Sequence, residues 1–210
     1  MADIHNPQLD KVYSAQTVEQ AEVAYDDWAE KYEADVFAFG FRLPAAAATI
    51  WARFVALDSG PILDAGCGTG LQSESLALAG YQPITGVDLS EGMLSVAAKK
   101  GIYSELRQMT LGKRLDFADA AFANTYSVGA ITPGHAPANS FDELIRVTRV
   151  GGLIVFSLRV DEAQEPAYPA AVQALAAARR WRHEFETDDF ATMPIGEPDV
   201  RSRVYVYRVL

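Results

Sequence analysis

The residues best suited to chemistry form a glycine-rich segment after a short apolar run: Ile62-Leu63-Asp64-Ala65-Gly66-Cys67-Gly68-Thr69-Gly70. Glycines let the backbone turn tightly and let a ligand approach it closely. A helix that starts directly after such a loop offers free N–H groups and a partial positive charge to an anionic group. An acid, Asp88, ends the next apolar run 18 residues beyond Gly70, close to the separation of about 20 residues expected of an acid that binds ribose hydroxyls. These residues predict a nucleotide-binding crevice.

The spacing of the glycines separates two classes of cofactor. A dinucleotide fingerprint, Gly-x-Gly-x-x-Gly, would place its third glycine at position 71, which is Leu71. This argues against an NAD-dependent oxidoreductase. Glycines two residues apart, preceded by Asp64, resemble motif I of the class I S-adenosylmethionine (SAM)-dependent methyltransferases. The resemblance continues at Gly86-Val87-Asp88-Leu89-Ser90, where an acid ends the second predicted strand.

The resemblance extends over most of the chain, from about Tyr25 to the end. Tyr25-Asp26-x-Trp28-Ala29-x-x-Tyr32 is similar to the cap helix of small-molecule methyltransferases, which closes over the methionine end of SAM. Residues 129–135, Asp142-Glu143-Leu144-x-Arg146-Val147 and Gly151-Gly152 resemble the small methyltransferase-like family named after the Williams–Beuren syndrome region. The resemblance implies SAM as cofactor and S-adenosylhomocysteine as product. It leaves the methyl acceptor undefined.

The resemblance also implies a set of site residues. Thr110 stands where the family usually has an aspartate that contacts the adenine amino group, and its hydroxyl can accept a hydrogen bond without that charge. Trp28 and Ser127 have an alternative role in core packing. His135 and Tyr126 are the candidate catalytic residues, since histidine can act as a base near neutral pH; a histidine that only bonds the loop backbone is the alternative. The expected cofactor-binding residues are Tyr25, Trp28, Tyr32, Asp64, Gly66, Cys67, Gly68, Thr69, Gly70, Asp88, Leu89, Met93, Thr110, Leu111, Tyr126 and Ser127.

The apolar pattern predicts the elements that must position these residues. Two helices are expected first, over 17–34 and 43–57. Strands and helices then alternate, which predicts a parallel, doubly wound sheet. A capping box at Ser140 and Glu143 would start one of the later helices. The expected fold is α/β, a Rossmann-like, doubly wound, seven-stranded, mostly parallel sheet with one antiparallel strand. We expect a single methyltransferase domain over 1–210, with N-terminal cap helices in 1–57 and the SAM-binding core in 58–210. The predicted strands cover 61–65, 83–88, 103–109, 121–127, 153–158, 181–186 and 202–209.

Composition narrows the range of partners. The net charge of −10 and the scattered basic residues argue against a nucleic-acid acceptor. The lone cysteine, Cys67, argues against a disulfide framework and a cysteine-rich metal site, and no metal is expected. We expect no secretory signal and no membrane span, hence a cytoplasmic protein. The predicted function is methyl transfer to an O, N or S atom of a small molecule. The alternative is a non-catalytic SAM- or nucleoside-binding protein that acts through a protein partner. Thr110 and the lack of an obvious base favour this alternative slightly, whereas the intact motif I, Asp88 and the aromatic cap favour the enzyme more.

Overall fold

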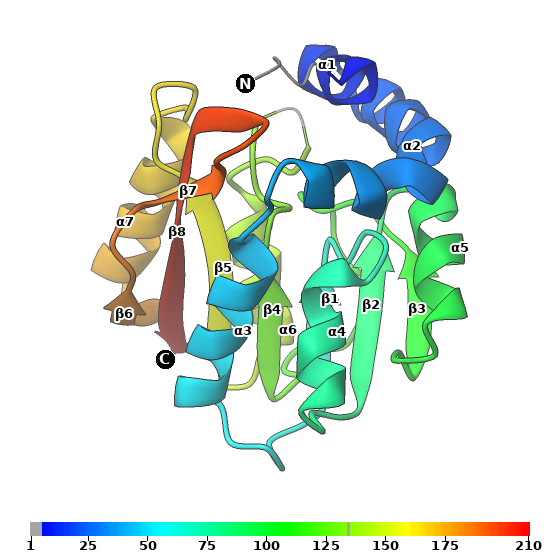
Figure 1. The fold of residues 1–210 in the computed structure, drawn as a ribbon. Helices are drawn as coiled ribbons and strands as arrows, with labels where there is room; N and C mark the ends of the chain where they lie inside the picture. Colours follow the sequence, from blue (N-terminus) through cyan, green and yellow to red (C-terminus); the bar gives the residue numbers. More distant parts are fainter. Residues whose placement is uncertain (1–5, 134) are drawn as a thin grey trace.

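The computed structural model describes residues 6–133 and 135–210. Its centre is a sheet with the strand order β3-β2-β1-β4-β5-β8-β6, in which β7 also pairs with β8 (Figure 1). Neighbours among the first five strands pair in parallel, and β8 pairs antiparallel with β5, β6 and β7. The predicted mostly parallel sheet with one antiparallel strand is therefore confirmed, with β7 as an addition. The strands are β1 Ile62–Ala65, β2 Ile84–Asp88, β3 Glu105–Gln108, β4 Asn124–Ser127, β5 Leu153–Arg159, β6 Trp181–Glu186, β7 Phe190–Met193 and β8 Glu197–Val209.

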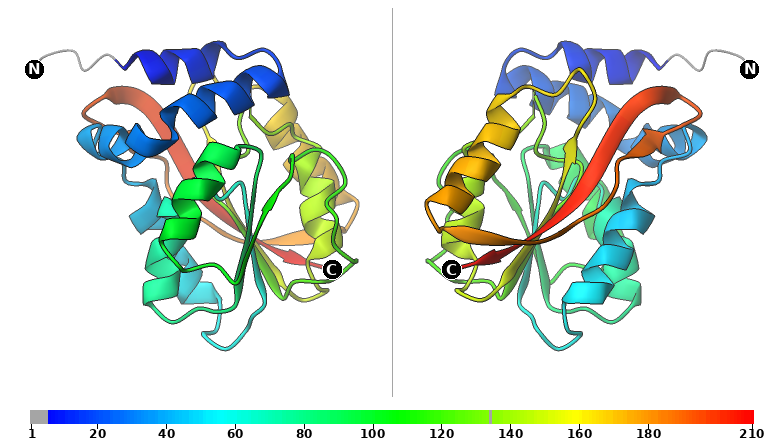
Figure 2. Two further views of the ribbon diagram at one scale, coloured as in Figure 1. Left: turned by 90° about the vertical axis from the view of Figure 1, so that its right-hand side faces the viewer. Right: turned by 90° about the vertical axis from the view of Figure 1, so that its left-hand side faces the viewer.

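Helices cover both faces of the sheet, as two opposite views show (Figure 2). Helices α3, α4 and α5 lie on one face, and α6 and α7 lie on the other. Helices α1 and α2 cross one end of the sheet instead of covering a face (Figures 1 and 2). This end carries the glycine loop, because residues of α2 and of the loop line one cavity. The helices are α1 Pro7–Ser14, α2 Val18–Ala38, α3 Leu43–Phe54, α4 Leu71–Leu78, α5 Glu91–Lys99, α6 Ser140–Val147 and α7 Ala167–Ala177.

Two apolar layers hold the helices onto the sheet. On one face, the ring of Phe156 in β5 stacks on Trp181 and lies 4.9 Å from that of Phe141 in α6. On the other face, Trp51 of α3 meets Tyr126 of β4 edge-on at 5.4 Å. All five rings are fully buried. Burial of this much apolar surface supplies most of the driving force for folding and fixes the strand ends that form the site.

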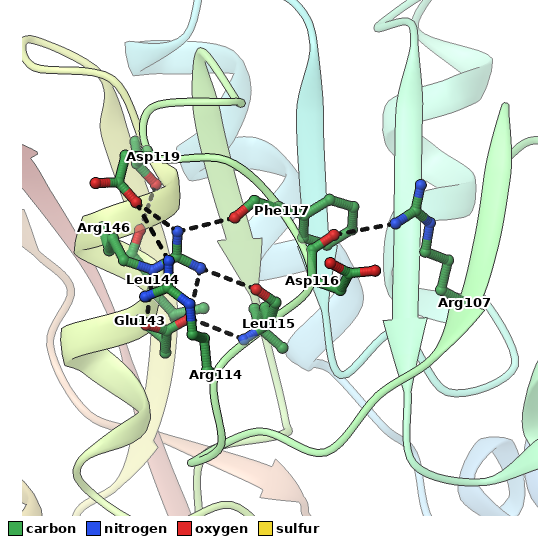
Figure 3. A network of polar contacts seen from close by, with 10 residues as sticks. Arg107, Arg114, Leu115, Asp116, Phe117, Asp119, Glu143, Leu144 and Arg146 are labelled. Carbon is green, nitrogen blue, oxygen red and sulfur yellow. Dashed lines mark hydrogen bonds and ion pairs between the residues drawn. The ribbon is translucent and has the colours of Figure 1, made fainter.

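A polar network fixes the loop between β3 and β4 (Figure 3). The guanidinium of Arg146 donates to the carbonyls of Leu115 and Phe117 and pairs with Asp119 and Glu143. Glu143 accepts from the backbone N–H of Leu115 at 2.9 Å. The predicted capping box is therefore wrong, since α6 starts without a side-chain cap and Glu143 is directed to Arg146. The side chain of Glu143 therefore binds the loop between β3 and β4 instead of capping the start of α6.

Helix α1 and strand β7 were not predicted. Asn6 caps α1, and its side chain accepts from the N–H groups of Gln8 and Leu9, with proline at the helix start. Strand β7 has four residues and pairs only with the first half of β8, which is longer than predicted. Both elements border the second of two cavities described below, so the sequence prediction lacked part of the wall of that cavity.

Candidate active site

The glycine loop joins β1 to α4 through three left-handed residues. Gly66, Gly68 and Gly70 have φ values of 78°, 53° and 82°, a region that glycine alone enters readily. A Cβ on Gly66 would overlap the Cβ of Ala130 from the segment after β4, so close packing excludes a side chain there. A Cβ on Gly68 would meet nothing within 4 Å. The space beside Gly68 is therefore open, and it faces a cavity.

This first cavity collects most of the predicted site. Ten predicted cofactor-binding residues line it, together with the candidate catalytic residue His135. The ten are Tyr25, Tyr32, Gly66, Cys67, Gly68, Thr69, Asp88, Leu89, Met93 and Leu111. Sequence reasoning did not select seven further lining residues, which are Leu71, Gln72, Met109, Val128, Gly129, Ala130 and Ala136.

Asp88 is the last residue of β2, and its carboxylate stabilises the glycine loop by hydrogen bonding. One carboxylate oxygen accepts from the N–H of Gly68 at 2.8 Å, and the other accepts from the N–H of Ser90 at 3.0 Å. Burial raises the pKa of the Asp88 carboxyl, while these two amides act in the opposite direction and nearby Asp26 adds to the rise. Each carboxylate oxygen has a second lone pair, so Asp88 can still accept hydrogen bonds from a ligand in the cavity.

Asp64 lies behind the loop and does not line the cavity. One of its carboxylate oxygens accepts from the hydroxyl of Ser73 at 2.6 Å and from that of Tyr103 at 2.7 Å. The other is buried without a partner among the described residues. Burial is the main cause that raises the pKa of Asp64 to about 6. Asp64 thus ties β1 to α4 and to the segment before β3.

Five other predicted residues also lie outside the lining of the first cavity. Gly70 is the N-cap of α4. The fully buried hydroxyls of Tyr126 and Ser127 are directed to the backbone oxygens of Gln72 and Ala65. Thr110 is half-buried between two lining residues. Trp28 donates its indole N–H to Asp35 at 2.7 Å and lines the second cavity.

Three buried polar atoms in residues that line the first cavity lack partners among the described residues. They are the hydroxyl of Thr69 in the loop, the side-chain carbonyl of Gln72 in the first turn of α4, and Nε2 of His135. A buried polar atom without a hydrogen bond costs free energy, so such atoms indicate a missing ligand. SAM fits this pattern, since its ribose hydroxyls can donate to Asp88 and its amino-acid end can bond Thr69 and Gln72. The position of Gln72 directly after the loop was the only sequence signal for it.

A second cavity adjoins the first. Both are lined by Tyr25, Tyr32, Gly129 and His135, so these four residues lie where the two cavities meet. The second cavity extends under α1 and α2 toward the hairpin of β7 and β8. Burial strongly raises the pKa of the Tyr25 and Tyr32 phenols, which keeps both of them neutral at physiological pH.

His135 lines both cavities and has one ring nitrogen without a partner among the described residues. Its Nδ1 lies 2.8 Å from the hydroxyl of Thr132 and 3.0 Å from the carbonyl of Pro133. A carbonyl can only accept, so Nδ1 carries the proton and Nε2 presents a lone pair. Nε2 is buried without a partner in the described part of the chain. Burial lowers the pKa of His135, which favours the neutral ring.

The cap helix α2 is held beside the cofactor cavity by a polar clamp. The Asp26 carboxylate accepts from the hydroxyl of Ser90 at 2.6 Å and from the N–H of Gly92 at 2.8 Å. Ser90 in turn donates its N–H to Asp88. A Cβ on Gly92 would lie 2.9 Å from the Cα of Asp26, so glycine permits this close approach of α2 to α5. The clamp connects the helix that carries Tyr25 to the strand end that carries Asp88.

Comparison with known proteins supports the same class of protein. A methyltransferase domain family matches residues 63–156, from β1 to β5. Human methyltransferase-like protein 27 is 35% identical over 165 residues, which cover 75% of this chain and 66% of that protein. The phosphatidylethanolamine N-methyltransferase of Cereibacter sphaeroides is 30% identical over 152 residues, covering 68% of this chain and 73% of that protein. The chain spans between about two fifths and two thirds of the first relatives it matches, with 66%, 42% and 59% of their lengths.

Solved structures agree on the fold. The [4+2]-cyclase SpnF has a TM-score of 0.72 at 14% identity, with 93% of this chain and 97% of that chain covered. Geranyl diphosphate methyltransferase, solved with geranyl diphosphate and the SAM analogue sinefungin, has a TM-score of 0.65 at 16% identity, with 79% and 77% covered. Fold, glycine loop and relatives together define a class I SAM-dependent methyltransferase. This chain belongs to that family, and its cofactor is SAM, so both sequence predictions are confirmed.

Proposed function

We propose that the enzyme transfers the methyl group of SAM to an O, N or S atom of a small-molecule acceptor bound in the second cavity. The observation that carries this proposal is the meeting of the two cavities at Tyr25, Tyr32, Gly129 and His135. The sulfonium of SAM already activates the methyl group, so the enzyme must mainly align the two reactants and exclude water. Adjoining cavities allow the in-line approach that methyl transfer needs.

The proposed cofactor site follows the lining of the first cavity. Asp88 would accept hydrogen bonds from the ribose hydroxyls. Thr69 and Gln72 would bond the amino-acid end, and the faces of Tyr25 and Tyr32 would stabilise the sulfonium cation. The apolar side chains that would enclose the adenine are Leu89, Met93, Met109 and Leu111, with Thr110 beside them.

The nature of the relatives supports a small-molecule acceptor. Several are ubiquinone biosynthesis O-methyltransferases, and one acts on phosphatidylethanolamine by name. The net charge of −10 disfavours a nucleic acid. A non-catalytic binding protein is not favoured, because the curated relatives are methyltransferases. SpnF carries the same fold with a different named activity, so the site must support the reaction type independently of the fold.

The cap residues 1–57 and the core 58–210 would work as one domain, since the first cavity is lined from both parts. The only cysteine, Cys67, is buried and unpaired. This use of cysteine supports a cytoplasmic location. None of the helices in the described residues has the length and apolar character needed to cross a membrane.

Calorimetric titration with SAM, S-adenosylhomocysteine and NAD tests the cofactor site first. We expect one saturable site for SAM and for its product, and none for NAD. Incubation with labelled SAM and a metabolite extract then tests transfer, and we expect label in an extracted small molecule. Label found only in macromolecules, or no binding of SAM, would contradict the proposal.

A further inference from the structure

The second cavity is mainly walled by carbon. Its aromatic walls are Tyr13 of α1, Trp28 of α2 and Phe41, in addition to the shared Tyr25 and Tyr32. The rings of Trp28 and Tyr32 meet edge-on at 4.9 Å, and those of Trp28 and Tyr25 are stacked at 6.4 Å. Aromatic walls of this kind favour a flat ring, which can pack against them by offset stacking or edge-to-face contact.

The charge on the wall of the second cavity is already neutralised. Arg159, at the end of β5, is its only charged lining residue within 6–133 and 135–210. The guanidinium pairs with both carboxylate oxygens of Asp161, at 2.8 and 3.0 Å, and lies 5.7 Å from the ring centre of Tyr13. The hydroxyl of Tyr13 donates to Glu197 at 2.8 Å. A charged acceptor would lose its hydration here without gaining an unpaired counter-charge, which is costly.

Among the side chains shared by the two cavities, His135 has a buried ring nitrogen, Nε2, that lacks a partner among the described residues. It presents a lone pair, because Nδ1 carries the proton. An acceptor atom that donates a hydrogen bond to Nε2 would stand between the two cavities, where the methyl group must arrive. The titratable and charged groups that face His135 are the phenol of Tyr25, with ring centres 5.4 Å apart, and Arg159.

We infer that the acceptor is a neutral aromatic compound that presents a phenolic hydroxyl to His135, and that His135 is the general base. This inference rests on the proposed function of the two cavities. The aromatic walls select the ring, the paired charges exclude ionised acceptors, and the free Nε2 selects an atom that carries a proton. A phenol loses its proton near pH 10 in water, as tyrosine does, whereas bulk water requires about 15.7. A neutral imidazole base therefore removes the proton of a phenol more easily than that of a hydroxyl group as weakly acidic as water, such as the hydroxyl of an aliphatic alcohol.

The step balances in atoms and charge. The phenolic oxygen forms a bond to the methyl carbon while the bond from that carbon to sulfur breaks, and the electron pair of the broken bond stays on sulfur. The phenolic proton passes to Nε2 of His135. The products are an aryl methyl ether, neutral S-adenosylhomocysteine and an imidazolium, which returns its proton to solvent after product release.

A matched panel of acceptors tests the class. We would compare phenol, benzoate and benzylamine, and their two-ring counterparts, with labelled SAM and the full chain. We expect methyl ethers from the hydroxyl compounds and no product from the carboxylates or amines. Preferential methylation of an acid or amine would overturn the inference while the proposed function stands, as would SAM binding without methylation of any hydroxyl compound. Absence of SAM binding would instead refute the proposed function.

Variants of two histidines test the base. His135→Gln removes the free imidazole and should lower kcat for the phenol by about 10²- to 10⁴-fold, a far larger effect than any change in the affinity for SAM. The wild-type rate should fall at acid pH as His135 is protonated, and this limb should be absent in the variant. His183→Gln is the matched control, because His183 lies exposed on β6, away from both cavities. Equal kcat values for His135→Gln and wild type would overturn the assignment.

Discussion

Replacement of Gly68 by alanine separates backbone strain from ligand contact. Gly68 has a φ of 53°, and an added Cβ would meet nothing within 4 Å. Alanine in this left-handed region costs about 1–2 kcal/mol. For a chain of this size that cost lowers Tm by roughly 2–8 °C. Gly101 provides a matched control, since it has a φ of 64°, also has nothing within 4 Å, and does not line either cavity.

The two variants should differ only when SAM is present. In Gly68→Ala the new methyl group occupies space that we assign to the cofactor, and overpacking of this kind costs about 1–3 kcal/mol. That range corresponds to a Kd for SAM weakened by roughly 5- to 150-fold. Gly101→Ala should keep the wild-type Kd despite a similar loss of Tm. The rise in Tm caused by saturating SAM should therefore shrink only in Gly68→Ala.

Calorimetric titration with SAM, and thermal unfolding with and without SAM, test these expectations on wild type, Gly68→Ala and Gly101→Ala. Equal SAM affinity in Gly68→Ala and Gly101→Ala would refute our placement of the cofactor beside the loop. A much larger loss of Tm in Gly68→Ala without ligand would refute the statement that open space surrounds this residue. The two readouts thus test the cavity and the loop conformation separately.

Three further predictions address the residues around the loop. Asp88→Asn should weaken SAM binding at least tenfold, because hydrogen bonds to a charged group contribute about 1.5–3 kcal/mol each. The variant should also lower Tm, because the side-chain N–H₂ of asparagine must face a backbone N–H that now donates to the carboxylate. An unchanged Kd for SAM would count against ribose binding by Asp88. Asp64 has a folded-state pKa of about 6, above its unfolded value, so its carboxyl disfavours folding increasingly as pH rises from about 4 to 6. In urea unfolding, the free energy of unfolding of wild type should fall by on the order of 3 kcal/mol relative to that of Asp64→Asn over this pH range. Parallel plots of unfolding free energy against pH for the two proteins would contradict a buried carboxyl with a raised pKa. Gly92→Ala should lower both Tm and SAM affinity although alanine is the better helix former, because its Cβ would meet Asp26; a raised Tm would show that α2 does not pack there.

The sequence was most informative where local chemistry and backbone geometry coincide. The glycine loop, the strand before it and Asp88 after it were predicted together, because left-handed glycines and a strand-end acid leave a local pattern. The cap helix was predicted from the spacing of its apolar residues and extends to Ala38, four residues further than expected. Its N-cap is Thr17, as the predicted start of the helix implied.

Contacts between distant segments were not predictable in this way. Asp64 was expected at the cofactor, but its partner Tyr103 is 39 residues away and draws the carboxylate behind the loop. Glu143 was expected to cap its own helix, but Arg146 and the N–H of Leu115, 28 residues away, hold it instead. In both cases a carboxylate bonds a group that only the folded chain brings near it, and a single sequence does not reveal such a partner.

The contacts of the cap helix link its position to the cofactor site. Helix α2 buries three alanines, Ala21, Ala24 and Ala29, together with Trp28 and Val36. Ion pairs anchor its outer side, from Glu30 to Lys99 at 2.7 Å and from Glu33 to Lys100 at 3.0 Å. The Glu30–Lys99 pair is exposed, and pairs of this kind contribute only about 0.2–1 kcal/mol, whereas the Glu33–Lys100 pair is partly buried. The Asp26 clamp to Ser90 and Gly92 holds α2 against the start of α5. Because Ser90 also bonds Asp88, binding of the cofactor at the ribose acid and docking of α2 should stabilise each other.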